Sequence, residues 1–295
     1  MMQTQRTTLV FVLALLVAVA RAGAETPPAP TPPTPVATAP DTVNAALPPD
    51  ADHAKAALAK SSRHGEWVDV KLPDGKKVVT WVVYPEKKAK AGVVIVIHEI
   101  FGLSDWVRGV TDQLAREGFI ALAPDLLSGM GPNGGGTESL GEEATKVIRT
   151  LTPDAVAARL DAVRAYALKL PAANGRVGAV GFCWGGAASF NYATAQPKLD
   201  GAVVFYGTSP SDPEAYAKIS APVLGHYAGD DERVDATIPT AQEAMKKLGK
   251  SYTAKVYDGA GHGFLRQQTG RDGANLKATE QAWPATIAFF RERLK

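Results

Sequence analysis

The chain has 295 residues, of which 45% are hydrophobic, with 32 Lys and Arg, 30 Asp and Glu, and one cysteine. This length allows one large domain or two ordinary ones, each with a buried core. A formal charge of +2 without a basic cluster argues against a nucleic-acid partner, and the absence of paired His or Cys at ligand spacing argues against a metal site.

The N-terminal residues have the pattern of an export signal. Arg6 precedes an apolar run at residues 9–20, and Ala22-Gly23-Ala24 offers a small-x-small cleavage site. A bilayer span takes roughly 20 apolar residues, so this run favours a cleaved signal peptide at residues 1–24 over a membrane anchor. We therefore expect a periplasmic or secreted protein without stable membrane association after cleavage.

A Pro- and Ala-rich stretch follows the predicted signal. Residues 25–60 have little apolar bulk and are expected to form an extended linker, although residues 51–60 are compatible with a helical turn or two. The folded domain is expected to occupy residues 61–295.

The domain alternates strand-like and helix-like segments. Residues 66–72 and 77–84 flank Pro73-Asp74-Gly75, which is typical of a β-hairpin. This alternation predicts an α/β fold: a mostly parallel sheet with helices on both faces and the hairpin at one edge. The other expected strands are 92–97, 119–122, 177–180, 202–206, 221–227 and 252–257, and the expected helices begin near 104, 152, 187, 237 and 279.

Two segments of the domain have unusual composition. Residues 128–142 are dense in glycine but lack the ending of a phosphate loop, so we expect a mobile surface loop, placed over the site. Pro284 lies inside the last predicted helix, 279–294, and is expected to kink or split it.

The single cysteine stands in a distinctive motif. Gly181-Phe182-Cys183-Trp184-Gly185-Gly186 follows a strand and precedes a helix, which is the arrangement of a nucleophile elbow with cysteine in place of serine. A buried, inert cysteine is the alternative. An unpaired cysteine in an oxidising compartment is either intermolecular or a reactive thiol. Composition alone favours the inert cysteine, but the position of Cys183 between glycines favours the nucleophile.

A cysteine nucleophile needs a base and an orienting acid. In α/β-hydrolases these follow the nucleophile in the order acid, histidine, each after a strand. His262 lies between two glycines after strand 252–257 and is the expected base; His53, His64, His98 and His226 are weaker candidates. The acid is one of Asp230, Asp231 and Asp235, with Asp231 favoured because Asp235 is positioned to cap the next helix.

Five motifs together resemble the dienelactone hydrolase family over nearly the whole domain. The resemblance implies a Cys183–His262–Asp231 triad, with Glu99 contacting the resting cysteine. It also implies an oxyanion hole at the backbone N–H groups of Ile100 and Trp184, the residue after the nucleophile. The motifs are His98-Glu99-Ile100-Phe101-Gly102, Ala123-Pro124-Asp125-Leu126, residues 181–186, Asp231-Glu232-Arg233-Val234 and Gly261-His262-Gly263-Phe264.

The resemblance also bears on the substrate. Arg266 matches one of the two arginines that hold the carboxylate of dienelactone in the family, but Leu127-Ser128-Gly129-Met130 contains no second arginine. Tyr206, at the end of strand 202–206, is a further candidate for substrate contact. Dienelactone itself is therefore in doubt, and a neutral or differently charged ester or lactone fits as well.

The expected function is a monomeric hydrolase that needs no cofactor and cleaves a small ester or lactone through a thioester acyl-enzyme on Cys183. One alternative is a general short-chain carboxylesterase. Another is a non-catalytic ligand-binding module on the hydrolase scaffold, because a fold does not determine a function.

Overall fold

The computed structural model describes residues 44–295, so the predicted signal peptide and most of the expected linker lie outside the described residues. One compact unit spans Val43–Lys295. Within residues 44–295, no helix combines the length and the apolar character needed to cross a bilayer.

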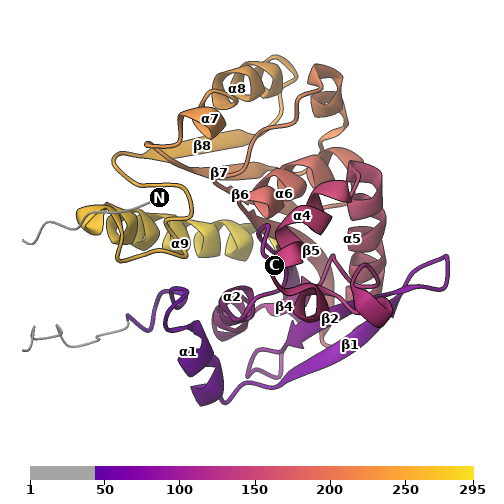
Figure 1. Cartoon of the computed structure of the whole chain (residues 1–295). Helices are drawn as coiled ribbons and strands as arrows, with labels where there is room; N and C mark the ends of the chain where they lie inside the picture. Colours follow the sequence, from indigo (N-terminus) through magenta and orange to yellow (C-terminus); the bar gives the residue numbers. More distant parts are fainter. Residues whose placement is uncertain (1–43) are drawn as a thin grey trace, which may run out of the picture. The chain divides into compact units, whose positions relative to one another are not determined.

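An eight-stranded sheet forms the centre of this unit (Figure 1), in the order β1-β2-β4-β3-β5-β6-β7-β8. The predicted hairpin forms its edge: β1 pairs antiparallel with β2, which pairs antiparallel with β4. All other pairs are parallel, which confirms the mostly parallel sheet. The strands are β1 Gly65–Lys71, β2 Lys77–Val83, β3 Ala91–Ile97, β4 Ile120–Pro124, β5 Ala173–Phe182, β6 Gly201–Phe205, β7 Val223–Ala228 and β8 Tyr252–Tyr257.

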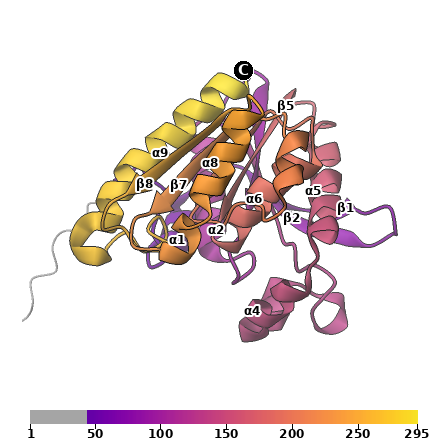
Figure 2. The same cartoon turned by 90° about the horizontal axis from the view of Figure 1, so that it is seen from above.

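Helices cover both faces of the sheet (Figures 1 and 2), as the alternating pattern predicted. One apolar core lies under α5, α6 and α8, and a second lies under α2 and α9. The helices are α1 Ala54–Lys60, α2 Asp105–Arg116, α3 Thr137–Leu140, α4 Ala144–Val147, α5 Pro153–Ala167, α6 Trp184–Ala195, α7 Glu232–Asp235, α8 Ile238–Lys247 and α9 Ala274–Arg293.

Local sequence signals explain where two of these helices begin. The hydroxyl of Ser104 accepts a hydrogen bond from the Val107 N–H at the start of α2, and the hydroxyl of Thr152 accepts one from the Ala155 N–H at the start of α5. Strand β3 is buried along its whole length, as expected for a parallel strand with helices on both faces.

The folded unit extends further toward the N-terminus than the expected boundary at residue 61. Leu47 and Ala54 are buried in the core beneath α2, and the indole N–H of Trp106 donates to the carbonyl of Pro49 (3.1 Å). Residues 44–60, which we expected to be linker, are therefore part of the packed structure. The composition of residues 44–60 did not predict this packing, because the segment has few apolar residues and is held largely through its backbone carbonyls.

Helix α9 differs from expectation in its start and in its course. It begins at Ala274, five residues earlier than expected, and continues through Pro284 without being split. Pro284 and Glu280, whose carbonyl loses its intrahelical partner, are both exposed, so water can satisfy that carbonyl. The buried face, which includes Trp283 and Phe290, holds the helix against the sheet.

The glycine-dense segment is more structured than a surface loop. A 3₁₀ turn at Pro132–Gly134, α3 and α4 follow each other, and Figure 2 shows the stretch around α4 standing out beyond the layers. The carboxylate of Asp125 accepts hydrogen bonds from the backbone N–H and the hydroxyl of Thr137 (2.8 and 2.7 Å). This buried aspartate therefore attaches the segment to the end of β4.

Candidate active site

Cys183 lies in a sharp turn between β5 and α6, with φ 56° and ψ −117°. Such a conformation is strained for a residue with a side chain and is held by its surroundings. A Cβ on Gly181 would lie 1.8 Å from the carbonyl oxygen of Gly185, and one on Gly185 would lie 2.3 Å from that of His98. The two glycines are therefore required for strand, turn and helix to approach this closely.

Asp231 and His262 form a hydrogen-bonded pair at the carboxyl ends of neighbouring strands. Asp231 follows β7 and precedes α7, and His262 follows β8. The Nδ1 of His262 lies 2.5 Å from Oδ2 of Asp231, whose side chain is only 9% exposed. A buried carboxylate at Nδ1 fixes the ring so that Nε2 is the nitrogen left to accept a proton.

The other two candidate aspartates have different surroundings. Asp230 pairs with Arg271 at the surface. Asp235, which we expected to cap the next helix, lies inside α7 instead, and α8 begins after Thr237. Among the three, the structure brings only Asp231 into contact with His262 within the described residues.

The remaining histidines occupy other places. The Nδ1 of His98 donates to the carbonyl of Glu99 (2.8 Å), and its Nε2 accepts from a backbone N–H just after β4 (3.1 Å). Burial lowers the pKa of His98 and lowers that of His226 to about 3, so both rings are neutral at pH 7. His53 and His64 lie before β1. Sequence reasoning considered His98 only as a weaker candidate for the base, whereas in the structure its ring fixes the loop that carries Glu99.

Glu99 is a buried carboxyl facing an arginine. It is 3% exposed, and its Oε2 lies 3.1 Å from the Nε of Arg266. The two atoms are not aligned for a hydrogen bond and find no other partner among the described residues. Burial raises the pKa of Glu99 to about 7, against the opposing charge of Arg266.

The surroundings of Cys183 favour its neutral thiol over the ionised thiolate. Burial raises its pKa, and the Glu99 carboxylate raises it further. The backbone N–H of Trp184 opposes this by donating to the sulfur. The charge of Glu99 therefore acts on Cys183, and direct contact between the two side chains stays a prediction.

Tyr206 lies close to these groups. It is fully buried, has a φ of 40°, and its ring centroid is 5.1 Å from that of His262. Burial raises its pKa well above the ordinary value, and the charges of Glu99 and Cys183 add to the effect. Its hydroxyl has no hydrogen-bond partner in the described part of the chain.

An apolar cluster borders the site on the side of β4. Leu127, Ala144 and Ile148 are buried in it, and Ile100 and Trp184 pack against it together with four further apolar side chains of residues 130–151. Sequence reasoning missed this cluster. Its signal was the helical spacing of residues 140, 144, 147, 148 and 151, which was obscured by the preceding glycines.

Comparison with known proteins places the chain in a family. The model of the dienelactone hydrolase family matches residues 78–294. A protein of Saccharolobus solfataricus named "Putative carboxymethylenebutenolidase" is 34% identical over 249 residues, covering 74% of this chain and 95% of the relative. The carboxymethylenebutenolidase of Pseudomonas putida is 32% identical over 210 residues, covering 68% of this chain and 86% of the relative.

Solved structures agree on the fold. The crystal structure titled "Putative Dienelactone Hydrolase" from Klebsiella pneumoniae has a TM-score of 0.69 at 24% identity, covering 78% of this chain and 99% of that one. The family model and the curated relatives extend the agreement from fold to family. The chain therefore belongs to the dienelactone hydrolase family of α/β-hydrolases and is a carboxylic-ester hydrolase.

Proposed function

We propose that this enzyme cleaves a neutral ester or lactone through a thioester acyl-enzyme on Cys183, with His262 as base and Asp231 as orienting acid. The observation that supports this most directly is the Asp231–His262 pair, positioned after β7 and β8 on the same sheet edge as the strained turn of Cys183. Sites in open α/β sheets form at this edge.

In the proposed first half-reaction, Nε2 of His262 takes the proton of the Cys183 thiol and the sulfur attacks the ester carbonyl carbon. The carbonyl oxygen becomes an oxyanion, held by the backbone N–H groups of Trp184 and Ile100. Collapse breaks the C–O bond, and His262 returns the proton to the leaving alcohol. A water molecule, deprotonated by His262, then attacks the thioester carbonyl carbon. The C–S bond breaks, the acid leaves, and His262 returns the proton to the sulfur of Cys183.

Glu99 is proposed to restrain the resting thiol. Its charge and the burial of the sulfur both raise the pKa of Cys183, so the resting cysteine is neutral and less readily oxidised. Because Glu99 lacks an aligned hydrogen bond to Arg266, an arriving substrate can displace its carboxyl group with little loss. Arg266 and Tyr206 then face the substrate.

The preference for a neutral substrate follows from the charges around the site. Leu127 and Met130 belong to the apolar cluster at the place where a second arginine would be needed to hold a carboxylate. Relatives of this chain are named carboxymethylenebutenolidase. For this chain, a neutral ester fits these side chains better than an anionic lactone.

Replacing the nucleophile tests the proposal. Cys183→Ala should lower kcat for p-nitrophenyl acetate by about 10⁴-fold or more, because the covalent route is lost. Thermal unfolding near that of the wild type would show that the variant is folded. A folded C183A variant with substantial esterase activity would contradict the proposal.

We also propose export with removal of residues 1–24, supported by Arg6, the apolar run at 9–20 and Ala22-Gly23-Ala24. N-terminal sequencing of the protein recovered from a periplasmic extract should begin at residue 25. A cytosolic protein with an intact N-terminus would contradict it.

A further inference from the structure

The strand order separates two sides of the site. His262 follows β8 and Asp231 follows β7, whereas the apolar cluster follows β4, with Cys183 after β5 in between. In the proposed reaction the leaving oxygen must lie near His262 to receive a proton. The acyl substituent on the same carbonyl carbon therefore points to the opposite side, toward the cluster.

Trp184 connects the nucleophile to this apolar side. Its backbone N–H donates to the sulfur of Cys183, while its side chain packs against the cluster and stacks on the ring of His98 at 5.9 Å. Trp184 therefore has two roles in the proposal. Its backbone N–H binds the oxyanion, and its side chain contacts the apolar side of the site.

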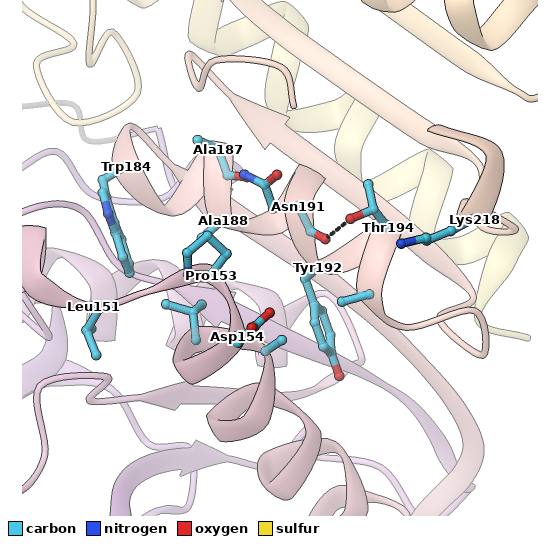
Figure 3. A pocket seen from close by; sticks show the side chains of 13 residues that line it. Leu151, Pro153, Asp154, Trp184, Ala187, Ala188, Asn191, Tyr192, Thr194 and Lys218 are labelled. Atoms are coloured by element: carbon cyan, nitrogen blue, oxygen red, sulfur yellow. Dashed lines mark hydrogen bonds between the residues drawn. The ribbon is translucent and has the colours of Figure 1, made fainter. Parts of the chain in front are cut away.

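A groove of about 420 Å³ begins at Trp184 and follows α6 (Figure 3). Trp184, Ala188, Asn191 and Ala195 line it at spacings of three or four residues, so they share one face of the helix. With a rise of about 1.5 Å per residue, this face extends for about 16 Å. That length exceeds an extended octanoyl chain.

The groove is apolar at the end near Trp184 and carries polar side chains further along α6. Leu151, Pro153 and Ala157 form the wall opposite α6. Figure 3 shows Lys218 at the end away from Trp184. The polar and charged lining residues are Asp154, Asn191, Tyr192, Thr194 and Lys218. Burial of each methylene contributes about 0.8 kcal/mol, so a chain in this groove would bind more tightly as it lengthens.

We infer that the groove along α6 binds the acyl chain of the substrate, which makes the enzyme selective for esters of medium-length linear fatty acids. The inference rests on the proposed function, because it uses Cys183 as the point of attachment and His262 as the side of the leaving group. Within the groove, Trp184 and Ala157 are the specificity-determining residues at the end closer to Cys183. Ala195 is the specificity-determining residue at the far end.

The test is a series of p-nitrophenyl esters of acetate, butyrate, octanoate and decanoate, measured as kcat/KM with the full chain. The wild type should prefer octanoate to acetate by at least tenfold. Ala157→Trp should lower this octanoate-to-acetate ratio at least fivefold, since the indole fills the groove. Ala195→Trp, at an exposed position, should lower the decanoate-to-butyrate ratio and so limit chain length from the far end.

The matched control is Ala158→Trp, which adds the same side chain to an exposed neighbour in α5 that does not line the groove. It should keep the wild-type ratios. Acetate hydrolysis without preference for longer chains, or equal ratios in A157W and A158W, would overturn the inference while leaving the proposed function intact. A wild type that hydrolyses none of the esters would overturn both.

Discussion

Glu99 has the most unusual environment of any residue in the site. It is buried beside Arg266 without an aligned hydrogen bond, and its pKa of about 7 leaves it only partly ionised at neutral pH. Its charge also raises the pKa of Cys183. The protonation of this one carboxyl group therefore influences both the reactivity of the thiol and the stability of the fold.

Removing the Glu99 charge should make the cysteine more reactive. In Glu99→Gln, burial still raises the pKa of Cys183, but the contribution of the carboxylate is gone and the thiolate fraction at pH 8 rises. We expect alkylation by iodoacetamide, followed by intact mass, to be several-fold faster than in the wild type. Glu138→Gln, at an exposed carboxylate, is the control and should change nothing. Equal or slower alkylation of E99Q would argue against the proposed restraint.

The same group predicts a pH dependence of stability. Because the folded-state pKa of Glu99 is raised to about 7, above an unfolded value near 4.5, its contribution to stability is present below pH 4.5 and is lost as pH rises through 7. The loss over this whole pH range is on the order of 3 kcal/mol. Urea denaturation at pH 5 and pH 8 should show a smaller fall in the free energy of unfolding for E99Q than for the wild type. An identical fall in both proteins would show that Glu99 does not have this raised pKa.

At the scale of elements, the segment before β1 supports the loop that carries Arg266. The backbone N–H of Ala51 donates to the carbonyl of Arg266 (2.9 Å), and the amide of Gln268 donates to the carbonyl of Pro48 (2.9 Å). This segment lies outside the part matched by the family model, residues 78–294. These two hydrogen bonds brace the side of the site that holds Glu99.

Leu47 is the apolar anchor of that brace. It is 5% exposed, so Leu47→Ala should lower the free energy of unfolding by about 2–3 kcal/mol through lost burial and a cavity. Urea denaturation would measure this, with Ala46→Ser at the exposed neighbouring position as the control. If L47A unfolded like A46S, residues 44–60 would behave as the linker expected from sequence.

At the scale of the whole molecule, the fold could be predicted where local signals and layer rules agree. The Pro73-Asp74-Gly75 turn indicated the edge hairpin, the caps Ser104 and Thr152 indicated two helix starts, and the β-branched run of β3 indicated a buried parallel strand. The position of Cys183 in a strand-to-helix turn was also visible, because the flanking glycines are needed by the geometry itself.

The features that escaped prediction depend on contacts between distant residues. The carboxylate of Asp125 accepts a hydrogen bond from the backbone N–H of Thr137, twelve residues later, and the carbonyl of Pro49 accepts one from the indole N–H of Trp106. No local pattern encodes either contact. The same holds for the misaligned Glu99–Arg266 pair and for the groove along α6, which exists only because residues 151–157 pack beside that helix.

The central claim is that Cys183 forms a covalent acyl-enzyme. It is tested most directly by mixing the protein with p-nitrophenyl acetate, quenching in acid within the first turnover, and measuring peptide masses. The peptide containing Cys183 should gain one acetyl group. At a pH high enough to ionise the thiol, the adduct should accumulate further in His262→Ala, because this variant lacks the base for deacylation. Ester hydrolysis in the wild type, with acetyl found on another residue or on none while C183A keeps its activity, would contradict it.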